Sequence, residues 1–278
     1  MNYIDDLIEI AINEDIGDGD HTSLSCIPKA TTGKAELLVK EKGIIAGVEL
    51  AKKIFSKIDS SLKFKQIIND GEYVNIGDIV FIVEGNSHSI LQAERLVLNF
   101  MQRMSGIASN TNYYVQLLDG LKTRVLDTRK TTPGLRLIEK WAVKIGGGVN
   151  HRMGLYDMIM IKDNHVDYAG GISNAITSSH KYRKENNKQI KIEIEARDLN
   201  ELNEILSVGG IDRIMLDNFS FEDMRTAVRL INGKYETEAS GGITDKTIRE
   251  YAECGVDFIS VGALTHQINS IDLSLKAI

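Results

Sequence analysis

The regular alternation of strand-like and helix-like segments after residue 122 constrains the fold more than any other feature of this sequence. Short apolar runs with strand character are mostly separated by longer runs in which apolar residues recur at helical spacing. Alternating segments of this kind predict a parallel sheet with helices packed against it. The expected strands cover residues 124–127, 158–162, 191–196, 213–217, 235–240 and 258–262, and the expected helices include 199–206, 221–231 and 246–254.

The number of these units favours a barrel-like α/β arrangement. Six or more successive βα units are expected to form a closed or nearly closed barrel rather than an open sheet, although strand order cannot be taken from a sequence. In such barrels the reactive groups lie where the strands end and the βα loops begin. The residues that follow each expected strand are therefore the first place to look for chemistry.

The first third of the chain has a different texture. Residues 34–41 and 78–84 have strand character, residues 48–58 have helical spacing, and residues 89–118 form a longer helical stretch. The change of pattern predicts a domain boundary near Gly106, where a break in the helix or a close contact is expected. The predicted division is an N-terminal domain over residues 1–106 and a catalytic domain over 107–267, with residues 268–278 free to pack with the N-terminal domain.

One further helix is expected to begin at Pro133, one of two prolines in the chain. Thr132 is a suitable N-cap, and the fixed φ of proline suits the first helical position. The glycine run 146–148 would end this helix. Lys140 and Lys144, both within it, are expected to lie on its solvated face.

Composition excludes several classes of protein. The net charge of −6 and the pI of about 5.6 argue against a nucleic-acid-binding protein held by bulk positive charge. The two cysteines, Cys26 and Cys254, allow neither a disulfide framework nor a zinc site, and they fit a reducing cytoplasm. The acidic N-terminus is unlike a signal peptide, and no apolar run reaches the roughly 18 residues of a membrane span.

Basic side chains gather in one stretch of the second domain. Residues 124–165 contain eight lysines and arginines against four acidic residues. Four of these cations stand at expected strand ends, where side chains converge, and convergent cations are costly to assemble without an anion. Planar guanidinium groups suit carboxylates and phosphates. We therefore expect a small polyanionic substrate, held by Arg129, Lys130, Arg152 and Lys162.

An acidic pair, Glu195 and Asp217, also stands at expected strand ends. These carboxylates are expected either to pair with the neighbouring cations or to hold Mg²⁺ or sugar hydroxyls, since Mg²⁺ in proteins often uses one or two carboxylates plus substrate phosphates. Glu193 shares the strand parity of Glu195, so it is expected to point the same way, and either could serve.

Two loops of small residues follow the last two expected strands. Ser240-Gly241-Gly242 is expected to open a helix, and Val261-Gly262-Ala263 follows the final strand. Small residues let backbone N–H groups approach a phosphate, and a helix N-terminus adds partial positive charge. The alternative is that these glycines only form tight turns. The position of the two loops favours phosphate binding.

The histidines divide by their neighbours. His151 and His165 adjoin the cations and are candidate site members, whereas the other four, His21, His88, His180 and His266, have no basic neighbours at expected strand ends.

Two rival functions use lysine chemistry. Lys130 or Lys162 could form a Schiff base, as in some barrel aldolases. Residues 71–78 are reminiscent of a biotinyl or lipoyl carrier, but the lysine-bearing tripeptide of that module is missing.

Taken together in order, the motifs resemble those of the quinolinate phosphoribosyltransferases, also called nicotinate-nucleotide pyrophosphorylases (carboxylating). Glu14-Asp15, Gly19-Asp20 and Thr22 match the N-terminal domain of that family, and Glu94-Arg95 and residues 105–108 match its linking helix. Six motifs of the second domain complete the match. They are residues 127–131 (Asp-Thr-Arg-Lys-Thr), 144–152, 161–165, 216–218, 240–242 and 261–266.

The resemblance implies a fold and a reaction. The fold is an N-terminal α/β sandwich domain followed by a barrel-like α/β domain with mostly parallel strands. The reaction is phosphoribosyl transfer from phosphoribosyl pyrophosphate to quinolinate with decarboxylation, giving nicotinate mononucleotide, pyrophosphate and CO₂ in NAD biosynthesis. A paralogue associated with molybdate transport is the nearest alternative, and the cationic set favours the quinolinate enzyme.

The resemblance also implies site residues and partners. Arg95 matches an arginine supplied across a homodimer interface, in a dimer or higher homo-oligomer. The quinolinate pocket would comprise Arg129, His151, Arg152 and Lys162. The phosphoribosyl donor and Mg²⁺ would involve Thr128, Lys130, Glu195 and Asp217, with Glu195 and Asp217 as metal ligands. The catalytic groups would be Lys130, Lys162, Glu195 and Asp217, and the 5-phosphate would bind at Ser240, Gly241, Gly242, Val261, Gly262 and Ala263.

Overall fold

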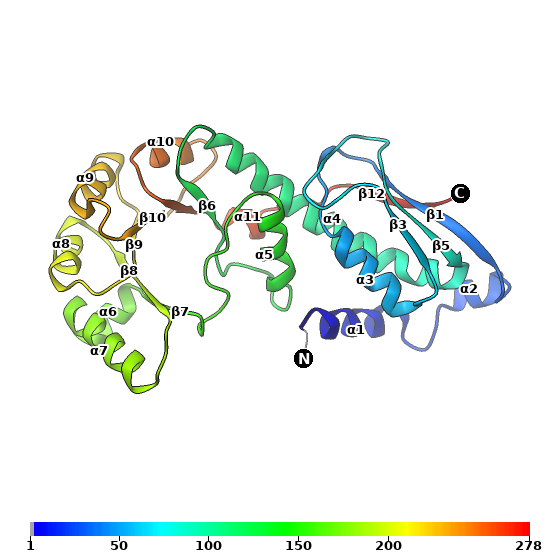
Figure 1. Cartoon of the computed structure of the whole chain (residues 1–278), viewed down its shortest axis with the longest axis horizontal. Helices are drawn as coiled ribbons and strands as arrows, with labels where there is room; N and C mark the ends of the chain where they lie inside the picture. Colours follow the sequence, from blue (N-terminus) through cyan, green and yellow to red (C-terminus); the bar gives the residue numbers. More distant parts are fainter. Residues whose placement is uncertain (1–2) are drawn as a thin grey trace. The chain divides into compact units, whose positions relative to one another are not determined.

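The structure is a computed structural model that describes residues 3–278 (Figure 1). The chain forms two compact units. The first unit contains the chain up to Asn112 together with Thr131–Gly147 and Ala263–Ile278, and the second contains Tyr113–Lys130 and Gly148–Gly262. The predicted boundary at residue 106 falls within the long helix α4 (Ser87–Leu117), which runs through it without interruption.

The first unit is built on an antiparallel sheet. Its strand β1 (Thr32–Val39) pairs with β5 (Ile79–Asn86) on one side and with β12 (Leu273–Ala277) on the other, while β3 (Lys63–Gln66) pairs with β5. The end of the chain therefore completes a sheet begun near its start. The other elements of this unit are α1 (Tyr3–Ile16), α2 (His21–Cys26), β2 (Gly43–Ile44), α3 (Val48–Ile58), β4 (Tyr73–Val74), α5 (Arg136–Ile145) and α11 (Ala263–His266).

Sequence periodicity accounts for the elements of this unit. Residues Ala35, Leu37 and Val39 alternate along β1 and are all buried, as a half-buried strand requires. The helix α3 has the predicted bounds, and its buried side chains recur at helical spacing. Asp70 accepts a hydrogen bond from the backbone N–H of Val48 (2.9 Å) and so satisfies a free donor at the start of α3.

The second unit is a six-stranded parallel sheet with strand order β6-β11-β10-β9-β8-β7. Every predicted strand is confirmed to within two residues. Figure 1 shows the helices of this unit along the outer side of the curved sheet. The elements are β6 (Arg124–Leu126), β7 (Met158–Ile161), α6 (Asp163–Ala169), α7 (Ile172–Glu185), β8 (Lys191–Ala196), α8 (Leu199–Val208), β9 (Arg213–Asp217), α9 (Phe221–Ile231), β10 (Glu236–Ser240), α10 (Ile248–Glu253) and β11 (Phe258–Ser260).

The sheet is barrel-like but open between β6 and β7, since no ladder joins these two strands within residues 3–278. The outer edge of β6 is covered instead by the segment around Val149, which forms a parallel bridge with Leu126. Val149 donates its N–H to the carbonyl of Val125 (2.8 Å) and accepts from the N–H of Asp127 (3.1 Å). This segment pairs with backbone N–H and C=O groups on the edge of β6 that β7 would pair with in a closed barrel.

The predictions for Gly106 and Pro133 need correction or refinement. No helix break occurs at Gly106, but the alternative of a close contact is confirmed, because a Cβ at this position would lie 2.2 Å from the carbonyl oxygen of Asn269. Pro133 does not begin a helix. The N–H of Thr132 donates to Glu139 (3.1 Å), and residues 133–135 form a turn before α5 begins at Arg136.

The predicted solvated face of α5 is wrong for one of its two lysines. Lys144 is exposed, whereas Lys140 is fully buried beside the equally buried Glu139. The buried surface of α5 is therefore wider than an ordinary amphipathic stripe. Within residues 3–278, no helix has the length and apolar character needed to cross a bilayer.

Candidate active site

The strands β8, β9 and β10 of the second unit carry charged side chains on one face only. On the opposite face Ile192, Ile194, Ile214, Leu216 and Ala239 are completely buried. Alternate residues on the polar face form ladders across β8, β9 and β10, because successive side chains of a strand point to opposite sides. In register, Glu193 lies beside Arg213, which lies beside Glu236, and one step further Asp217 lies beside Ser240.

Several charged residues lie at the carboxyl ends of these strands, on the same face of the sheet. The Nζ atom of Lys162 lies 3.1 Å from Oε2 of Glu195. Glu195 is buried, whereas the side chain of Lys162 is 44% exposed. Burial raises the pKa of the Glu195 carboxyl, Lys162 lowers it, and the charge of Asp217 raises it again. The structure thus brings Lys162, Glu195 and Asp217 together, as predicted.

Two arginines also approach each other at this edge. Burial lowers the pKa of the Arg152 guanidinium, and repulsion from the charge of Arg129 lowers it further. Arg152 is half-buried and donates through Nη1 to the carbonyl of Met158 (3.2 Å), while Arg129 is exposed. We use the name rim cluster for Arg129, Arg152, Lys162, Glu195 and Asp217.

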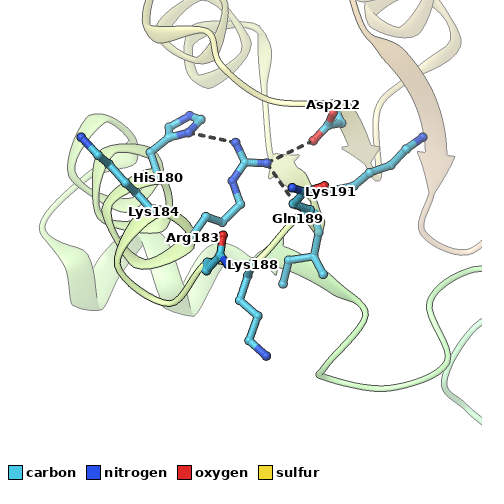
Figure 2. A pocket seen from close by; sticks show the side chains of 9 residues that line it. His180, Arg183, Lys184, Lys188, Gln189, Lys191 and Asp212 are labelled. Carbon is cyan, nitrogen blue, oxygen red and sulfur yellow. Dashed lines mark hydrogen bonds and ion pairs between the residues drawn. The ribbon is translucent and has the colours of Figure 1, made fainter.

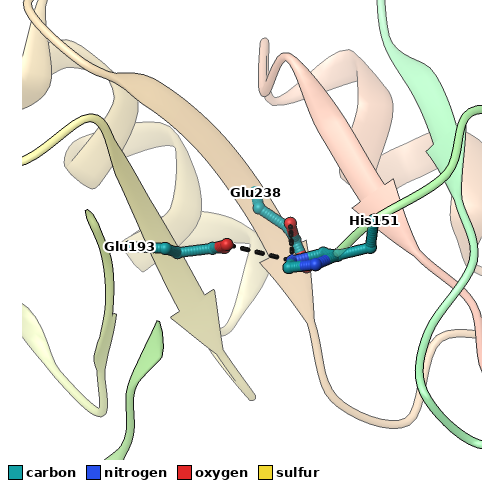
Figure 3. A group of neighbouring side chains, drawn as sticks. All are labelled: His151, Glu193 and Glu238. Atoms are coloured by element: carbon teal, nitrogen blue, oxygen red, sulfur yellow. Dashed lines mark ion pairs between the residues drawn. The ribbon is translucent and has the colours of Figure 1, made fainter. Parts of the chain in front are cut away.

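A second group of charged residues lies deeper on the same face. Nε2 of His151 lies 2.9 Å from Oε2 of Glu193 and 3.3 Å from Oε2 of Glu238 (Figure 3). Arg213 reaches the same Glu238 oxygen through Nη1 at 3.2 Å. Both glutamates are completely buried, and His151 and Arg213 nearly so. We call His151, Glu193, Arg213 and Glu238 the buried cluster.

Electrostatics within the buried cluster are strongly perturbed. Burial lowers the pKa of His151, but contacts with Glu193 and Glu238 outweigh it and raise the value to about 9. Burial, together with the charge of Glu238, raises the pKa of Glu193 to about 7. Burial also acts to raise the pKa of Glu238, but its contacts with His151, Ser260 and Arg213 outweigh this and lower it. His151 and Glu193 therefore hold their protons more tightly than free side chains would, and Glu238 holds its proton less tightly.

The ring of His151 is fixed at both nitrogens. The backbone N–H of Arg152 donates to Nδ1 (2.7 Å), which assigns the ring proton to Nε2, the atom that faces the two glutamates. A fully protonated imidazolium would have to displace this contact, which opposes the electrostatic pull toward protonation; the geometry supports the neutral tautomer in this conformation. The backbone N–H of His151 donates to Oδ1 of the buried Asp127 (2.8 Å).

The two glycine loops behave differently from the prediction in one respect. The loop at Gly241 and Gly242 does not open a helix directly, because α10 begins only at Ile248 after a further turn. Gly241 packs so closely against Asn218 that a Cβ on Gly241 would lie 2.2 Å from Oδ1 of Asn218. A Cβ on Gly242 would meet no atom within 4 Å. The helix-dipole part of the phosphate argument is therefore lost, and backbone access at Gly242 remains.

The second loop and the remaining predicted residues lie near the ends of strands or in the other unit. The N–H of Val261 donates to the carbonyl of Leu126 (3.0 Å), and the N–H of Lys130 donates to Oγ1 of Thr128 (3.0 Å). His165 is exposed, and its Nδ1 accepts from the N–H of Lys162 (3.0 Å). Arg95, which is exposed on α4, and Ala263, at the start of α11, belong to the first unit, while Gly262 ends the second.

The carboxylates of the rim fit a hard cation. Glu195 and Asp217 offer oxygen ligands from neighbouring strands, and the charge of Asp217 contributes to raising the pKa of Glu195, an effect that a divalent cation would oppose. Lys162 already neutralises Glu195 in part, so a cation there would share this carboxylate with the lysine. Glu193 cannot substitute for Glu195 at the rim, because it is buried against His151.

Sequence reasoning missed Asp127, Arg213 and Glu238 as parts of the site. A signal was present, because the segments 191–195, 213–217 and 236–240 each place polar residues at alternate positions of an otherwise apolar strand. Strands buried on both faces are usually apolar throughout. Charged residues at period 2 in such strands indicate a polar interior rather than a solvated face.

A basic hollow lies at the opposite, amino-terminal edge of the same sheet, around Arg183, Lys184, Lys188 and Lys191 (Figure 2). The guanidinium of Arg183 is held by the carbonyl of Ile190 (3.0 Å), by Nδ1 of His180 (3.1 Å) and by Asp212 (3.9 Å). None of the predicted site residues lines this hollow.

Comparison with known proteins connects the whole chain to one family. Residues 20–105 match the description "Quinolinate phosphoribosyl transferase, N-terminal domain", and residues 107–276 match the corresponding C-terminal domain. The chain is 47% identical over 285 residues to quinolinate phosphoribosyltransferase [decarboxylating] 1b of Nicotiana tabacum, covering 97% of this chain and 81% of the relative.

A bacterial relative and a solved structure agree with this match. The probable nicotinate-nucleotide pyrophosphorylase [carboxylating] of Bacillus subtilis is 41% identical, covering 94% of this chain and 89% of the relative. The structure of the nicotinate-nucleotide pyrophosphorylase from Francisella tularensis superimposes with a TM-score of 0.93 at 40% identity, covering 100% of this chain and 96% of that one.

Proposed function

The chain belongs to the quinolinate phosphoribosyltransferase family, and we propose that it catalyses the reaction for which that family is named. In that reaction the phosphoribosyl group of phosphoribosyl pyrophosphate passes to quinolinate. The products are nicotinate mononucleotide, pyrophosphate and CO₂, and the pathway served is NAD biosynthesis. The Schiff-base and carrier alternatives find no counterpart among these relatives.

The observation that carries the proposal is the match of both parts of the chain to the quinolinate phosphoribosyltransferase family, with 47% identity to a relative of that name. The charges at the rim support it: burial and the charge of Arg129 lower the pKa of the half-buried Arg152, while the charges of Glu193 and Asp157 raise it. Quinolinate carries two carboxylates, and planar guanidinium groups bind carboxylates through paired hydrogen bonds. Lys162 supplies a third cation at the same edge of the sheet.

The proposed roles follow this distribution of charge. Arg129, Arg152 and Lys162 bind and orient quinolinate, with His151 in support from below. Thr128, Lys130, Glu195 and Asp217 face the ribose and pyrophosphate of the donor. Backbone groups of the two small-residue loops bind the 5-phosphate, with the residues Ser240, Gly241, Gly242, Val261, Gly262 and Ala263.

The chemistry requires positioning rather than a covalent enzyme intermediate. Two anions must approach each other, and fixed cations offset their repulsion and hold them in line. The pyridine nitrogen bonds to C1 of the ribose while the bond from C1 to pyrophosphate breaks. The quaternised ring then accepts the electron pair of the adjacent carbon–carboxylate bond, CO₂ leaves, and the ring carbon takes a proton.

Mg²⁺ is proposed as the cofactor of this chain, with Glu195 and Asp217 as its protein ligands. When bound, it neutralises negative charge on the departing pyrophosphate. Lys162 opposes the rise in the pKa of Glu195 that burial causes, and so favours the ionised carboxylate that a cation or a ribose hydroxyl would contact.

The assembly and location are further proposals. A homodimer or higher homo-oligomer would place Arg95, exposed on α4, in the site of a neighbouring subunit. Mixing an inactive Arg95→Ala protein with an inactive Lys162→Ala protein should then restore activity, and no recovery after verified subunit exchange would contradict a shared site. A cytoplasmic location fits the cysteine content, although several plant relatives are described as mitochondrial or chloroplastic.

The function is tested by incubating the protein with quinolinate labelled in the carboxylate next to the ring nitrogen, phosphoribosyl pyrophosphate and Mg²⁺. Labelled CO₂ and nicotinate mononucleotide should appear in equal amounts, and both should require each component. Absence of either product from folded protein would contradict the proposal. Borohydride added with the substrate should trap no adduct on Lys130 or Lys162.

A further inference from the structure

The buried cluster lies beneath the rim cluster and shares backbone contacts with it. His151 and Arg152 are consecutive, so the residue that faces Glu193 and Glu238 is bonded directly to one that faces the substrate edge. The N–H of Arg152 donates to Nδ1 of His151, and the N–H of His151 donates to Asp127. The position of the imidazole therefore determines where the backbone of Arg152 lies.

The cluster is arranged in a way that stability alone does not explain. Two completely buried glutamates converge on one nitrogen of His151. Among residues 3–278, both carboxylate oxygens of Glu193 and Oε1 of Glu238 accept no hydrogen bond, so Oε2 of Glu193 contacts Nε2 of His151 as an ion-pair partner without hydrogen-bond geometry. Buried carboxylate oxygens left in this state are costly, and apolar side chains of similar volume are often at least as stable in such places. A functional constraint is the usual reason for retaining such groups.

A metal ion is a poor occupant for this cluster. His151, Glu193 and Glu238 could offer one ligand atom each, and these atoms lie within 4.8 Å of one another. However, the guanidinium of Arg213 lies 3.2 Å from the Glu238 oxygen that also faces His151. A divalent cation bound there would be repelled by this fixed positive charge. Arg213 already fills the position that a cation would take beside Glu238.

Resting on the proposed function, we infer that Glu193 and Glu238 are positioning residues, which clamp the His151 ring so that its Nδ1 holds the backbone of Arg152 at the quinolinate site. Arg213 keeps Glu238 in place from the other side (Nη1–Oε2 3.2 Å). The clamp acts on the acceptor substrate, because its hydrogen bond leads from Nδ1 of His151 to the backbone of Arg152, which is assigned to quinolinate. Glu195 and Asp217, which are assigned to the donor, stand nearer the carboxyl ends of the same strands, β8 and β9.

The chain supplies a matched control in Glu236. It lies on the same strand as Glu238, with the same parity, and Nη2 of Arg213 contacts its Oε2 at 3.1 Å. Unlike Glu238, it is 38% exposed at the side chain and its other ion-pair partner is Lys191 rather than His151. Substitution of Glu236 therefore removes one ion pair of Arg213 but leaves the contact of its Nη1 with Glu238 and both glutamate contacts of His151 in place.

The test compares Glu193→Gln, Glu238→Gln and Glu236→Gln by calorimetric titration with quinolinate, and separately with phosphoribosyl pyrophosphate and Mg²⁺. The first two variants should bind quinolinate about 10-fold more weakly, with donor affinity unchanged within about 2-fold. Glu236→Gln should match the wild type for both ligands. Glu193→Ala should bind quinolinate more weakly than Glu193→Gln, because the amide keeps an oxygen that can accept from Nε2.

A second readout does not depend on ligand or turnover. Exchange of the Arg152 amide hydrogen should accelerate in Glu193→Gln and Glu238→Gln but not in Glu236→Gln, because only the clamp holds the acceptor for this hydrogen. If either Glu193→Gln or Glu238→Gln fails to fold, the exchange rate of the Arg152 amide in the other variant tests the clamp.

Several outcomes would overturn the inference. These are equal effects in all three glutamine variants, an equal loss of affinity for both substrates, or unchanged exchange at Arg152. A stoichiometric metal in the purified wild type that disappears in His151→Gln would also do so. Failure of the wild type to convert quinolinate would instead count against the proposed function, so the two failures are distinguishable.

Discussion

The rim cluster and the buried cluster occupy the same face of one sheet, and each combines acidic with basic side chains. Lys162 at the rim is 44% exposed, so its contact with Glu195 forms next to solvent and can be exchanged for contacts with a ligand. In the buried cluster His151 is only 5% exposed and both of its glutamate partners are completely buried. There, no ligand can replace a partner without opening the protein.

This difference shows how a sheet can separate binding from support. Exposed charges are available to substrates but contribute little to stability, because solvent screens them. Buried charges are unavailable to substrates and costly to leave unpaired, so they hold neighbouring groups in fixed positions. The rim cluster should therefore respond to substitution in activity, and the buried cluster mainly in stability and positioning.

The largest effect is expected at the rim. Lys162→Ala should lower kcat/KM for quinolinate by about 10³-fold, because it removes one of the three cations that bind and orient quinolinate for attack. Thermal unfolding should be nearly unchanged, since the lysine is substantially exposed. Steady-state kinetics and calorimetry measure both quantities.

The control for this variant is Lys188→Ala, at the basic hollow on the opposite edge of the sheet. It should retain full activity. A similar loss of activity in both lysine variants would mean that general positive charge, rather than the rim position, supports the reaction.

The next effect is expected in the buried cluster. Glu238→Ala removes a partner of both His151 and Arg213 and should lower the free energy of unfolding by about 3–5 kcal/mol. Urea denaturation of the variant and wild type gives this value. A loss below about 1 kcal/mol would show that the buried cluster resembles the rim cluster in its contribution to stability.

A smaller effect is expected from pH. The two glutamates raise the pKa of His151 to about 9 from the value of 6.5; taken alone, this shift would give a stabilisation that is complete below about pH 6.5 and lost as pH rises through 9. The groups around the ring are Glu193, Glu238, Arg213 and Arg152. A second ring proton would sit on Nδ1 and break its contact with the Arg152 N–H, so the stability difference between the wild type and His151→Gln should stay constant within about 1 kcal/mol, and a loss of up to roughly 3 kcal/mol across this interval would contradict the clamp.

Urea denaturation at pH 6, 8 and 10 measures that difference, and the variant corrects for other groups that titrate in the same range. A constant difference across this series would mean that His151 keeps one protonation state throughout. The ring would then act through its neutral tautomer alone, as its contact with the Arg152 N–H favours.

Much of this organisation could be predicted from the sequence, because it depends on local patterns. The parallel strands and the convergence of Lys162, Glu195 and Asp217 follow from βα alternation and from the rule that such sites lie at strand ends. The contacts of Glu238 and Arg213 could not be predicted, since they depend on strand order and register. Lys140 was misplaced because a charged residue was assumed to be solvated, whereas the structure buries it.

The smallest effect is expected at the far end of the same strands. Lys191, at the start of β8, pairs with Glu236 at 3.4 Å, and both side chains are substantially exposed. Lys191→Ala should change the free energy of unfolding by less than about 1 kcal/mol and leave activity intact. Denaturation and kinetics on one preparation test this. A loss comparable to that of Glu238→Ala would remove the contrast between exposed and buried charges.

A crystal structure of the protein with quinolinate would test the central claim most directly. The account predicts that the two carboxylates lie within hydrogen-bond distance of Arg129, Arg152 and Lys162, with the His151 ring unmoved beneath them. Quinolinate bound instead at the basic hollow around Arg183, or at a site that contacts none of the three rim cations, would contradict it.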